Sequence, residues 1–302
     1  MQTTSQLLMI QPVQFGYNPQ TAVNNAFQLK SEGSLQKEAL DAFRNFVDLL
    51  RSNHLHVTVI EDTLEPATPD SIFPNNWISF HEDNSIILYP MFAPNRQQER
   101  KQHVLDIIQQ QFKVSQVHDL THFEKAGLYL EGTGSMVFDR INRIAYACLS
   151  PRTSKEVLEA FEKITGNQLQ IFNAEDEKGQ PIYHTNVLMC MLENEVVICL
   201  DAITNPIERV SITDMFTKTG KEIIPISQEQ MNHFAGNMLQ VQNELGEKLL
   251  IMSTQAYDSL HPSQLESLQK NNRLIHAPLS VIESAGGGSA RCMIAEVFNS
   301  PK

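Results

Sequence analysis

Positive charge is scarce in this chain. Its 302 residues include 23 Lys and Arg against 35 Asp and Glu, which gives a formal net charge of −12. Binding of nucleic acids depends on the neutralisation of phosphates by Lys and Arg, so this balance argues against a nucleic-acid partner. No apolar run approaches the roughly 18 residues of a membrane span, and residues 1–6 lack the basic segment that begins a signal peptide. No membrane partner is therefore expected.

Cysteine is rare as well, with four residues in the whole chain. Cys148, Cys190 and Cys199 lie within apolar runs, where a cysteine usually serves as a small buried hydrophobe. No two cysteines form a CxxC pair, and none stands at a zinc-type spacing from a histidine. We therefore expect no metal site and no cofactor, and a reducing cytoplasm is the simplest location for such a chain.

Four polar residues recur along the chain at nearly equal intervals, and each precedes a short apolar stretch. The intervals are 55 residues from Asn76 to Glu131, 53 from Glu131 to His184, and 108, twice 54, from His184 to Cys292. Asn237 stands near the middle of the longest interval. A constant period of this length indicates stacked supersecondary units. It also places a carboxylate, an imidazole and a thiol at equivalent points of successive units, which is how an active site can be assembled.

Each unit has the pattern of a ββαβ motif. A strand pattern, a short polar turn and a second strand pattern follow each periodic residue, then a helical pattern in most units, and then a third strand. The predicted second strands cover residues 85–91, 143–149, 196–202 and 248–254, and the predicted third strands cover 56–60, 114–120, 168–173, 222–226 and 273–278. Helices are predicted over 34–52 and 97–112, after residues 153 and 263, and more weakly over 213–218.

The chain contains five such units, and its ends fit a closed ring. Residues 292–298 supply a strand with nothing after it, and residues 7–13 supply a strand with no hairpin partner before it. Pairing of these two strands would close the ring and remove the exposed sheet edges. Because no low-complexity linker divides the chain, we predict a single domain over residues 1–302.

Cys292 is the strongest candidate for a chemical role. A free cysteine near a chain end is usually inert, but a glycine-rich turn over residues 284–290 stands directly before this one, and Arg291 adds a positive charge. A flexible backbone lets a substrate approach closely, and a nearby cation favours the thiolate, which is the nucleophilic form. The turn is not a phosphate-binding loop, because the Gly-Lys-Ser/Thr sequence is absent.

The other periodic residues also have ordinary structural explanations. His184 is one of ten histidines, and Glu131 and Asn76 suit turns. Their recurrence in phase favours a shared site. If they converge, the set is a thiol nucleophile, an imidazole and an orienting carboxylate, which fits covalent catalysis with proton transfer. A cysteine protease needs the same groups, so the residues alone leave the substrate open.

The periodic residues, the ββαβ unit and the segment 286–293 together resemble the pentein superfamily of guanidine-group-modifying enzymes. Segments 73–81 and 89–96 are most similar to its amidinotransferase-like, citrulline-utilisation hydrolase branch. The resemblance covers nearly the whole chain, with the motifs in family order. It implies an α/β fold in the form of a five-bladed, pseudo-symmetric propeller with the active site at its central axis.

The resemblance also implies roles for individual residues. Cys292 would attack the central carbon of a guanidino or ureido group, His184 would protonate the leaving amine and then activate water, and Glu131 would hold the substrate nitrogens. Arg152 lies in a Leu-Ser-x-Arg-Thr segment like that of the dimethylarginine hydrolases and would grip the α-carboxylate as a bidentate pair. A solvated residue at a helix start is the equal alternative for Arg152. The remaining substrate-binding residues expected are Asn76, Asn186 and Asn237, and the role of Arg96 stays open.

Two departures from the family pattern bear on the substrate. Arginine deiminases and arginine-using amidinotransferases carry aspartate where this chain has Asn76 and Asn186, so two negative charges are missing. An amide can donate to and accept from a neutral ureido group. We therefore expect a cysteine-dependent hydrolase that cleaves a C–N bond of a ureido or guanidino amino acid, with citrulline, giving ornithine, ammonia and CO2, as the first substrate to test. Some arginine dihydrolases of the superfamily also have asparagine at the first position, which keeps arginine open.

Two alternatives remain beside this expectation. The first is an arginine deiminase, dihydrolase or amidinotransferase. The second is a non-catalytic binding pentein, similar to the ribosome anti-association factor, although Glu131, His184, Cys292 and the acidic balance argue against it. The expected partner is a small-molecule amino acid, and homo-oligomer formation is left open.

Overall fold

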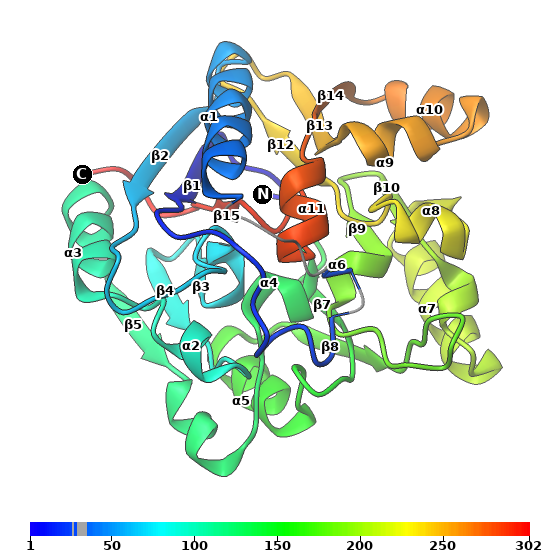
Figure 1. Cartoon of the computed structure of the whole chain (residues 1–302). Helices are drawn as coiled ribbons and strands as arrows, with labels where there is room; N and C mark the ends of the chain where they lie inside the picture. The colour runs from blue at the N-terminus through cyan, green and yellow to red at the C-terminus, as the bar shows by residue number, and fades with distance from the viewer. Residues whose placement is uncertain (26, 29–34) are drawn as a thin grey trace.

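Five small sheets arranged around a central axis make up the computed structural model, which describes residues 1–25, 27–28 and 35–302 (Figure 1). Each sheet has three strands, and its middle strand pairs antiparallel with one neighbour and parallel with the other. The strands are β1 (Gln6–Gln11), β2 (His56–Glu61), β3 (Ile78–Phe80), β4 (Ser85–Leu88), β5 (Gln116–Asp119), β6 (Val137–Asp139), β7 (Ile144–Cys148), β8 (Gln168–Phe172), β9 (Met189–Met191), β10 (Glu195–Ile198), β11 (Glu222–Pro225), β12 (Leu239–Gln242), β13 (Lys248–Ser253), β14 (Arg273–Ala277) and β15 (Ala295–Glu296).

The ring is closed by the two ends of the chain. Strand β15 pairs antiparallel with β1, in a register that places Leu7 opposite Glu296 and Leu8 opposite Ala295. Strand β1 also pairs in parallel with β2, so the sheet β15–β1–β2 combines the last strand of the chain with the first two. The predicted closure and the five-unit α/β propeller are both confirmed.

Helices lie mainly on the outside of the ring, where α1, α3, α5, α7 and α10 surround the sheets (Figure 1). The helices are α1 (Gln36–Ser52), α2 (Pro94–Gln97), α3 (Gln102–Gln111), α4 (Gly132–Ser135), α5 (Lys155–Thr165), α6 (Thr185–Leu188), α7 (Pro206–Lys218), α8 (Gln228–Asn232), α9 (Thr254–Ser259), α10 (Pro262–Gln269) and α11 (Ser280–Gly286), with 3-10 turns η1 (Pro74–Asn76), η2 (Thr121–Ala126) and η3 (Leu200–Ala202). None in the described part of the chain is long and apolar enough to cross a membrane.

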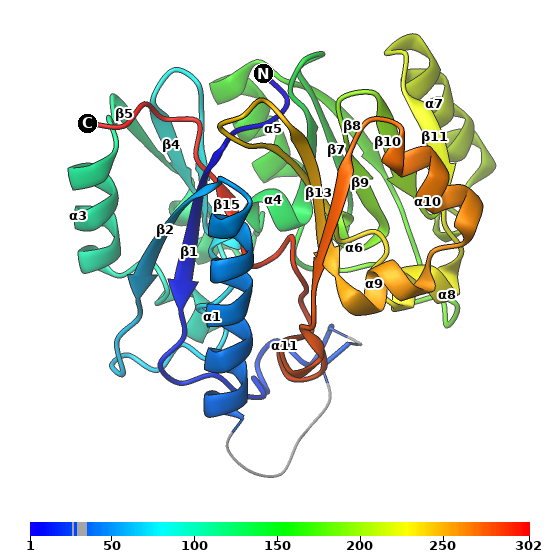
Figure 2. The ribbon, with the colours of Figure 1, turned by 90° about the horizontal axis from the view of Figure 1, so that it is seen from above.

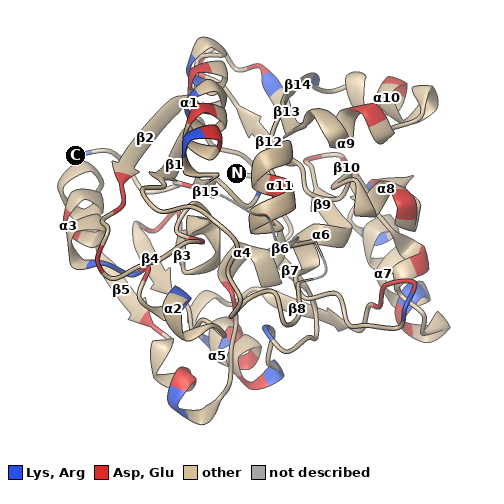
Figure 3. Cartoon of the chain, viewed as in Figure 1, with Lys and Arg blue, Asp and Glu red and all other residues tan. Residues whose placement is uncertain are grey.

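Amphipathic patterns explain why these helices cover the sheets. In α1 the residues at helical spacing, among them Phe43, Phe46 and Leu50, are buried. Burial of such a side chain contributes about 1.5–3 kcal/mol to folding. Charged residues lie on the outward faces, as Figure 3 shows for α1, α7 and α10. The apolar stripe therefore fixes α1 to its sheet.

The observed helices differ from the sequence prediction in three places. The helix predicted over 97–112 is two helices, α2 and α3, separated by residues 98–101. The helix predicted weakly over 213–218 is longer, because α7 begins at Pro206 and the Asn205 side chain caps it by accepting from the amide of Ile207 at 3.0 Å. A helical turn, rather than a strand, stands at three of the periodic positions (η1, α4 and α6). The predicted first residue of α1, at position 34, lies outside the described residues.

Candidate active site

The periodic residues converge at the centre of the ring. Asn76 ends η1, Glu131 and His184 stand directly before α4 and α6, and Cys292 follows α11. Their side chains are buried, with no more than 4% of any of these residues exposed. Asn76, His184 and Cys292 line one cavity of about 20 Å³. In this state the cavity has room for about one water molecule.

His184 and Glu131 form a hydrogen-bonded pair. The imidazole Nε2 lies 2.7 Å from Oε2 of Glu131. Burial lowers the pKa of His184 to about 4, although Glu131 opposes this shift. The imidazole is therefore neutral at neutral pH, and because a carboxylate only accepts, Nε2 carries the proton and Nδ1 is free to accept one.

The carboxylate of Glu131 is fully engaged by the protein. Its Oε1 accepts from the backbone amide of Phe92 at 3.0 Å, and its Oε2 also lies 3.4 Å from Arg152 and 3.8 Å from Arg96. Burial alone would raise the pKa of Glu131, but Arg152 and His184 hold it below its usual range. Both carboxylate oxygens of Glu131 already have partners in the protein, so neither is free to hold substrate nitrogens as the resemblance implies. These contacts suit a carboxylate that orients His184.

Two amide side chains face the thiol of Cys292. Asn237 donates through Nδ2 to Sγ at 3.2 Å, and Asn186 does so at 3.5 Å. Asn237 is fixed in turn, because its Oδ1 accepts from the amide of Arg291 at 3.1 Å and its Nδ2 donates to the carbonyl of Asn186 at 2.9 Å. Oδ1 of Asn186 has no partner among the described residues. The expected site residues Asn186 and Asn237 thus lie beside the thiol of Cys292.

The positive charge of Arg291, the residue before Cys292, is paired with other groups of the protein. The guanidinium of Arg291 donates to Glu296 at 2.8 Å and to the carbonyl of Ile294 at 2.9 Å. It lines a different small cavity, whose wall does not include Cys292. The sequence-based argument that Arg291 stabilises the thiolate is therefore wrong, because this cation already has an anionic partner.

Asn76 is positioned by an arginine that the sequence left without a role. Nη1 of Arg96 donates to Oδ1 of Asn76 at 2.9 Å, while Nε and Nη2 of Arg96 form a bidentate pair with Glu99 at 2.8 and 3.0 Å. Nδ2 of Asn76 has no partner in the described part of the chain. Gly134 lies against it, because a Cβ there would stand 2.4 Å from Nδ2 of Asn76 and 2.7 Å from Nδ1 of His184. Glycine is therefore required at position 134 to keep both groups accessible.

Arg152 is buried, not solvated, and its donors meet the N-terminal segment. Nε donates to Oδ1 of Asn24 at 2.8 Å, and Nη2 donates to the carbonyl of Thr21 at 2.8 Å. The guanidinium also stacks 5.0 Å from the ring centre of Tyr183. An amide oxygen and a carbonyl oxygen thus occupy the positions that a substrate α-carboxylate would take on this guanidinium.

The sequence analysis missed Asp70. Its Oδ2 accepts from Asn18 at 2.7 Å and from Thr21 at 2.9 Å, and it lies 4.0 Å from Nε of Arg96. Oδ1 of Asp70 has no hydrogen-bond partner among the described residues. Burial raises the pKa of this carboxyl. Asp70 lies six residues before Asn76, outside the periodic positions. Its closeness in sequence to the first periodic residue was the signal that could have identified it.

The N-terminal segment after β1 closes the site against the glycine-rich turn. Asn25 donates to the carbonyl of Gly287 at 3.3 Å, and Gln28 donates to that of Gly286 at 3.0 Å. The hydroxyl of Tyr183 donates to the carbonyl of Gly287 from the other side, at 2.7 Å. Figure 2 shows this segment beside α11 at one end of the ring. As described, the cavity of about 20 Å³ is too small to hold an amino acid.

Within the described ranges no group of three or more His, Cys, Asp or Glu residues could hold a metal ion. The cavity instead brings together a thiol, a neutral imidazole with an orienting carboxylate, and polar atoms without partners. Such a set is suited to nucleophilic attack on an electrophilic carbon, with proton transfer by the imidazole.

The chain is similar to known proteins in sequence and in fold. The chain matches the family model of eukaryotic N,N dimethylarginine dimethylhydrolases over residues 11–299. A comparison with curated protein sequences finds no match.

Several solved structures share the fold. Apo ArgZ, an arginine dihydrolase from the ornithine–ammonia cycle in Cyanobacteria, superposes with a TM-score of 0.77 at 18% identity, covering 97% of this chain and 40% of ArgZ. The N-terminal domain of ArgZ, as a Cys-to-Ser mutant bound to substrate, gives 0.75 at 18% identity and covers 97% of both chains. A dimethylarginine dimethylaminohydrolase adduct with S-methyl-L-thiocitrulline gives 0.67 at 16% identity, covering 97% of this chain and 99% of that one. This chain thus spans about two fifths of full-length ArgZ.

Proposed function

Because this chain belongs to the N,N dimethylarginine dimethylhydrolase family of the pentein superfamily, whose members modify guanidino groups, we propose that it hydrolyses C–N bonds at the guanidino carbon of arginine. Cys292 is the nucleophile, and ornithine, CO2 and two molecules of ammonia are the products. The observation that carries the proposal is the meeting of Cys292, the His184–Glu131 pair and Arg152 around one buried cavity.

The charges around the cavity favour arginine over citrulline. Asp70, Glu99 and Glu131 face the guanidinium groups of Arg96 and Arg152, so three carboxylates surround two cations. With all three carboxylates ionised, a substrate with a cationic guanidinium brings this buried cluster to formal neutrality, whereas neutral citrulline does not. Burial raises the pKa of Asp70, and it raises that of Glu99 to about 7, so a cationic substrate also favours the ionised form of both groups. Citrulline, the first substrate that the sequence suggested, then becomes an intermediate of the reaction. ArgZ, whose fold this chain shares, is an arginine dihydrolase, which supports the same choice.

The first half of the reaction uses His184 as a proton carrier. Sγ of Cys292 bonds to the guanidino carbon while its proton passes to Nδ1 of the neutral imidazole. The imidazolium, stabilised by Glu131, then gives this proton to the departing nitrogen, and ammonia leaves. His184 next takes a proton from water as the oxygen attacks the same carbon. Expulsion of Cys292 yields a ureido group.

The two asparagines suit the second half of the reaction. Nδ2 of Asn76 is a donor without a described partner, and Oδ1 of Asn186 is an acceptor without one. A ureido group presents one carbonyl oxygen and an NH2 group, so the pair can satisfy both. An aspartate at position 76 could not donate to that oxygen. Hydrolysis at the ureido carbon releases the second ammonia and leaves a carbamate, which breaks down to ornithine and CO2.

Recognition of the amino-acid end is assigned to Arg152 and Asp70. Arg152 binds the α-carboxylate once Asn24 withdraws its amide oxygen, and a planar guanidinium suits this bidentate contact. Oδ1 of Asp70 accepts from the α-ammonium group, which supplies the partner it otherwise lacks. Substrate binding therefore replaces contacts of the N-terminal segment with equivalent contacts to the ligand.

Incubation of the protein separately with arginine, citrulline and N,N-dimethylarginine tests this proposal. Ornithine, citrulline, ammonia and dimethylamine are assayed, with Cys292→Ser as the control. Two ammonia per ornithine from arginine supports a dihydrolase. Release of dimethylamine with no action on arginine would instead make the protein a methylarginine hydrolase, and turnover of citrulline alone would restore the sequence-based expectation.

A further inference from the structure

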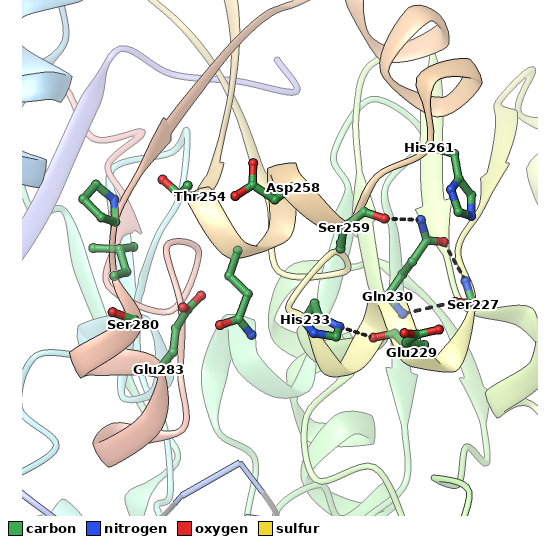
Figure 4. A pocket seen from close by; sticks show the side chains of 13 residues that line it. Ser227, Glu229, Gln230, His233, Thr254, Asp258, Ser259, His261, Ser280 and Glu283 are labelled. Carbon is green, nitrogen blue, oxygen red and sulfur yellow. Dashed lines mark hydrogen bonds between the residues drawn. The ribbon is translucent and has the colours of Figure 1, made fainter.

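A second cavity, separate from the catalytic one, lies between α8, α9 and α11. Its volume is about 560 Å³, far larger than the central cavity. Figure 4 shows the side chains that line it, with Glu283 rising from α11 and Asp258 from α9. No residue is shared by the two cavity walls. The larger cavity therefore has room for a small organic molecule that does not take part in the reaction.

The wall of this second cavity carries only one sign of fixed charge. Glu229, Asp258 and Glu283 line it, and no Lys or Arg does so among the described residues. The described residues also contain no cluster of His, Cys, Asp or Glu that could hold a metal ion. The remaining lining groups are mostly hydroxyl, amide and imidazole groups. This chemistry fits an organic cation.

Glu283 is the feature that distinguishes this cavity from an ordinary acidic surface. Only 3% of the residue is exposed, and Oε2 has no hydrogen-bond partner among the described residues. Its other oxygen accepts from the hydroxyl of Ser289 at 2.6 Å. Burial raises the pKa of this carboxyl, while the nearby hydroxyl of Ser253 opposes the shift. A ligand ammonium group is one partner that can satisfy such an oxygen.

The ligand needs two separated positive charges and no negative one. Asp258 and Glu229 are exposed, at other parts of the wall from buried Glu283. These two carboxylates are solvated and need no counter-charge, but they can attract a second ammonium group of the same ligand. A basic amino acid would bring a carboxylate of its own into a wall with no Lys or Arg to receive it.

We propose that this cavity binds a small aliphatic diamine as its diammonium ion, with one ammonium group on Glu283 and the other near Asp258 and Glu229. The site is connected to the nucleophile through a short path. Ser289 donates to Glu283, and the carbonyl of Ser289 accepts from the amide of Cys292 at 2.9 Å. These contacts link the wall of the cavity to the turn that carries the thiol of Cys292.

Isothermal titration calorimetry with 1,4-diaminobutane on the full chain tests the proposal without any need for turnover. Saturable binding of one diamine per chain is expected. Glu283→Gln and Asp258→Asn should each weaken it by about ten-fold or more, since loss of a charged partner costs at least 1.4 kcal/mol. Asp258 is exposed, so its variant keeps the fold even if Glu283→Gln does not. Glu266→Gln, an exposed carboxylate of α10 outside the cavity, is the matched control and should bind like wild type.

Two comparisons locate the bound diamine and test its form. Binding that survives Asp70→Asn but not Asp258→Asn supports the second cavity, whereas the reverse pattern would place the diamine in the catalytic cavity and overturn the proposal. Butylamine, with one ammonium group, should bind about ten-fold more weakly. Absence of saturable binding to wild type, or equal binding by all variants, would also overturn it.

Discussion

Arg96 holds Asn76 by a hydrogen bond of 2.9 Å from Nη1 to Oδ1, and this contact fixes which way the amide faces. Because Oδ1 is engaged by the guanidinium, Nδ2 is the atom that remains without a partner in the described structure. The site therefore presents a hydrogen-bond donor at this point. An aspartate at the same position would present a second acceptor and add a negative charge.

Asn76→Asp should turn the enzyme towards simple deimination. The carboxylate would still bind the cationic guanidinium of arginine, but it could not donate to a ureido oxygen, and an unmet buried group costs about 1–3 kcal/mol. We expect the ratio of ornithine to citrulline formed from arginine to fall by about ten-fold or more. The exposed Asn194→Asp is the matched control and should leave this ratio unchanged. An unchanged ratio in Asn76→Asp would show that Asn76 does not select the second step.

Glu131→Gln separates two roles for this carboxylate. If Glu131 orients His184, the variant should lower kcat by about 100-fold or more, as loss of an acid–base function does, with little change in KM for arginine. If Glu131 instead holds the substrate nitrogens, KM should rise as well. The variant also removes an anion from Arg152 and Arg96, so its Tm should fall. Steady-state kinetics and thermal unfolding measure both effects, with exposed Glu156→Gln as the control.

Arg152→Lys should weaken binding of the α-carboxylate specifically. Lysine keeps the charge beside Glu131 but lacks the planar fork that pairs with a carboxylate through two bonds. We expect KM for arginine to rise by about ten-fold or more, while agmatine, which lacks the carboxylate, is processed as by wild type. Exposed Arg44→Lys should change neither substrate. Equal losses with arginine and agmatine would assign Arg152 a purely structural role.

The pH dependence of kcat/KM should show that the neutral form of His184 is the active one. The pKa of His184 is lowered by burial to about 4, so the proton-accepting imidazole is present above this pH and is lost as the pH falls through it. We expect kcat/KM to stay level from pH 7 down to about 5 and to fall as the pH approaches 4, with circular dichroism used to confirm that the protein remains folded. Exposed His122→Gln should give the same profile. Activity that increases as the pH falls from 6.5 towards 4 would mean that the imidazolium starts the reaction.

The sequence predicted the architecture well because the ββαβ unit repeats. Period and strand pattern together identified each sheet, and the unpaired strands at the two ends predicted the β1–β15 pairing. The helix starts were less predictable. The length of α7 depended on an Asn205–Pro206 cap that its weak apolar pattern did not reveal.

The centre of the site was predicted in part. The phase of the repeat brought Cys292, His184 and Glu131 together, and it also placed Asn237 beside the thiol. Periodicity carries no information on groups supplied by the segments between units, so Asp70 and the Asn24 contact to Arg152 were missed. It also says nothing of side-chain direction, which is why Arg291 was assigned to the thiol although it pairs with Glu296.

Intact-mass analysis of the protein, quenched in acid milliseconds to seconds after mixing with arginine, tests the central claim most directly. The account predicts a species heavier than the free chain by one arginine less one ammonia, located on Cys292 by peptide mapping and absent from Cys292→Ser. Consumption of arginine with no covalent species at any time, or the same adduct in Cys292→Ser, would contradict covalent catalysis by this thiol.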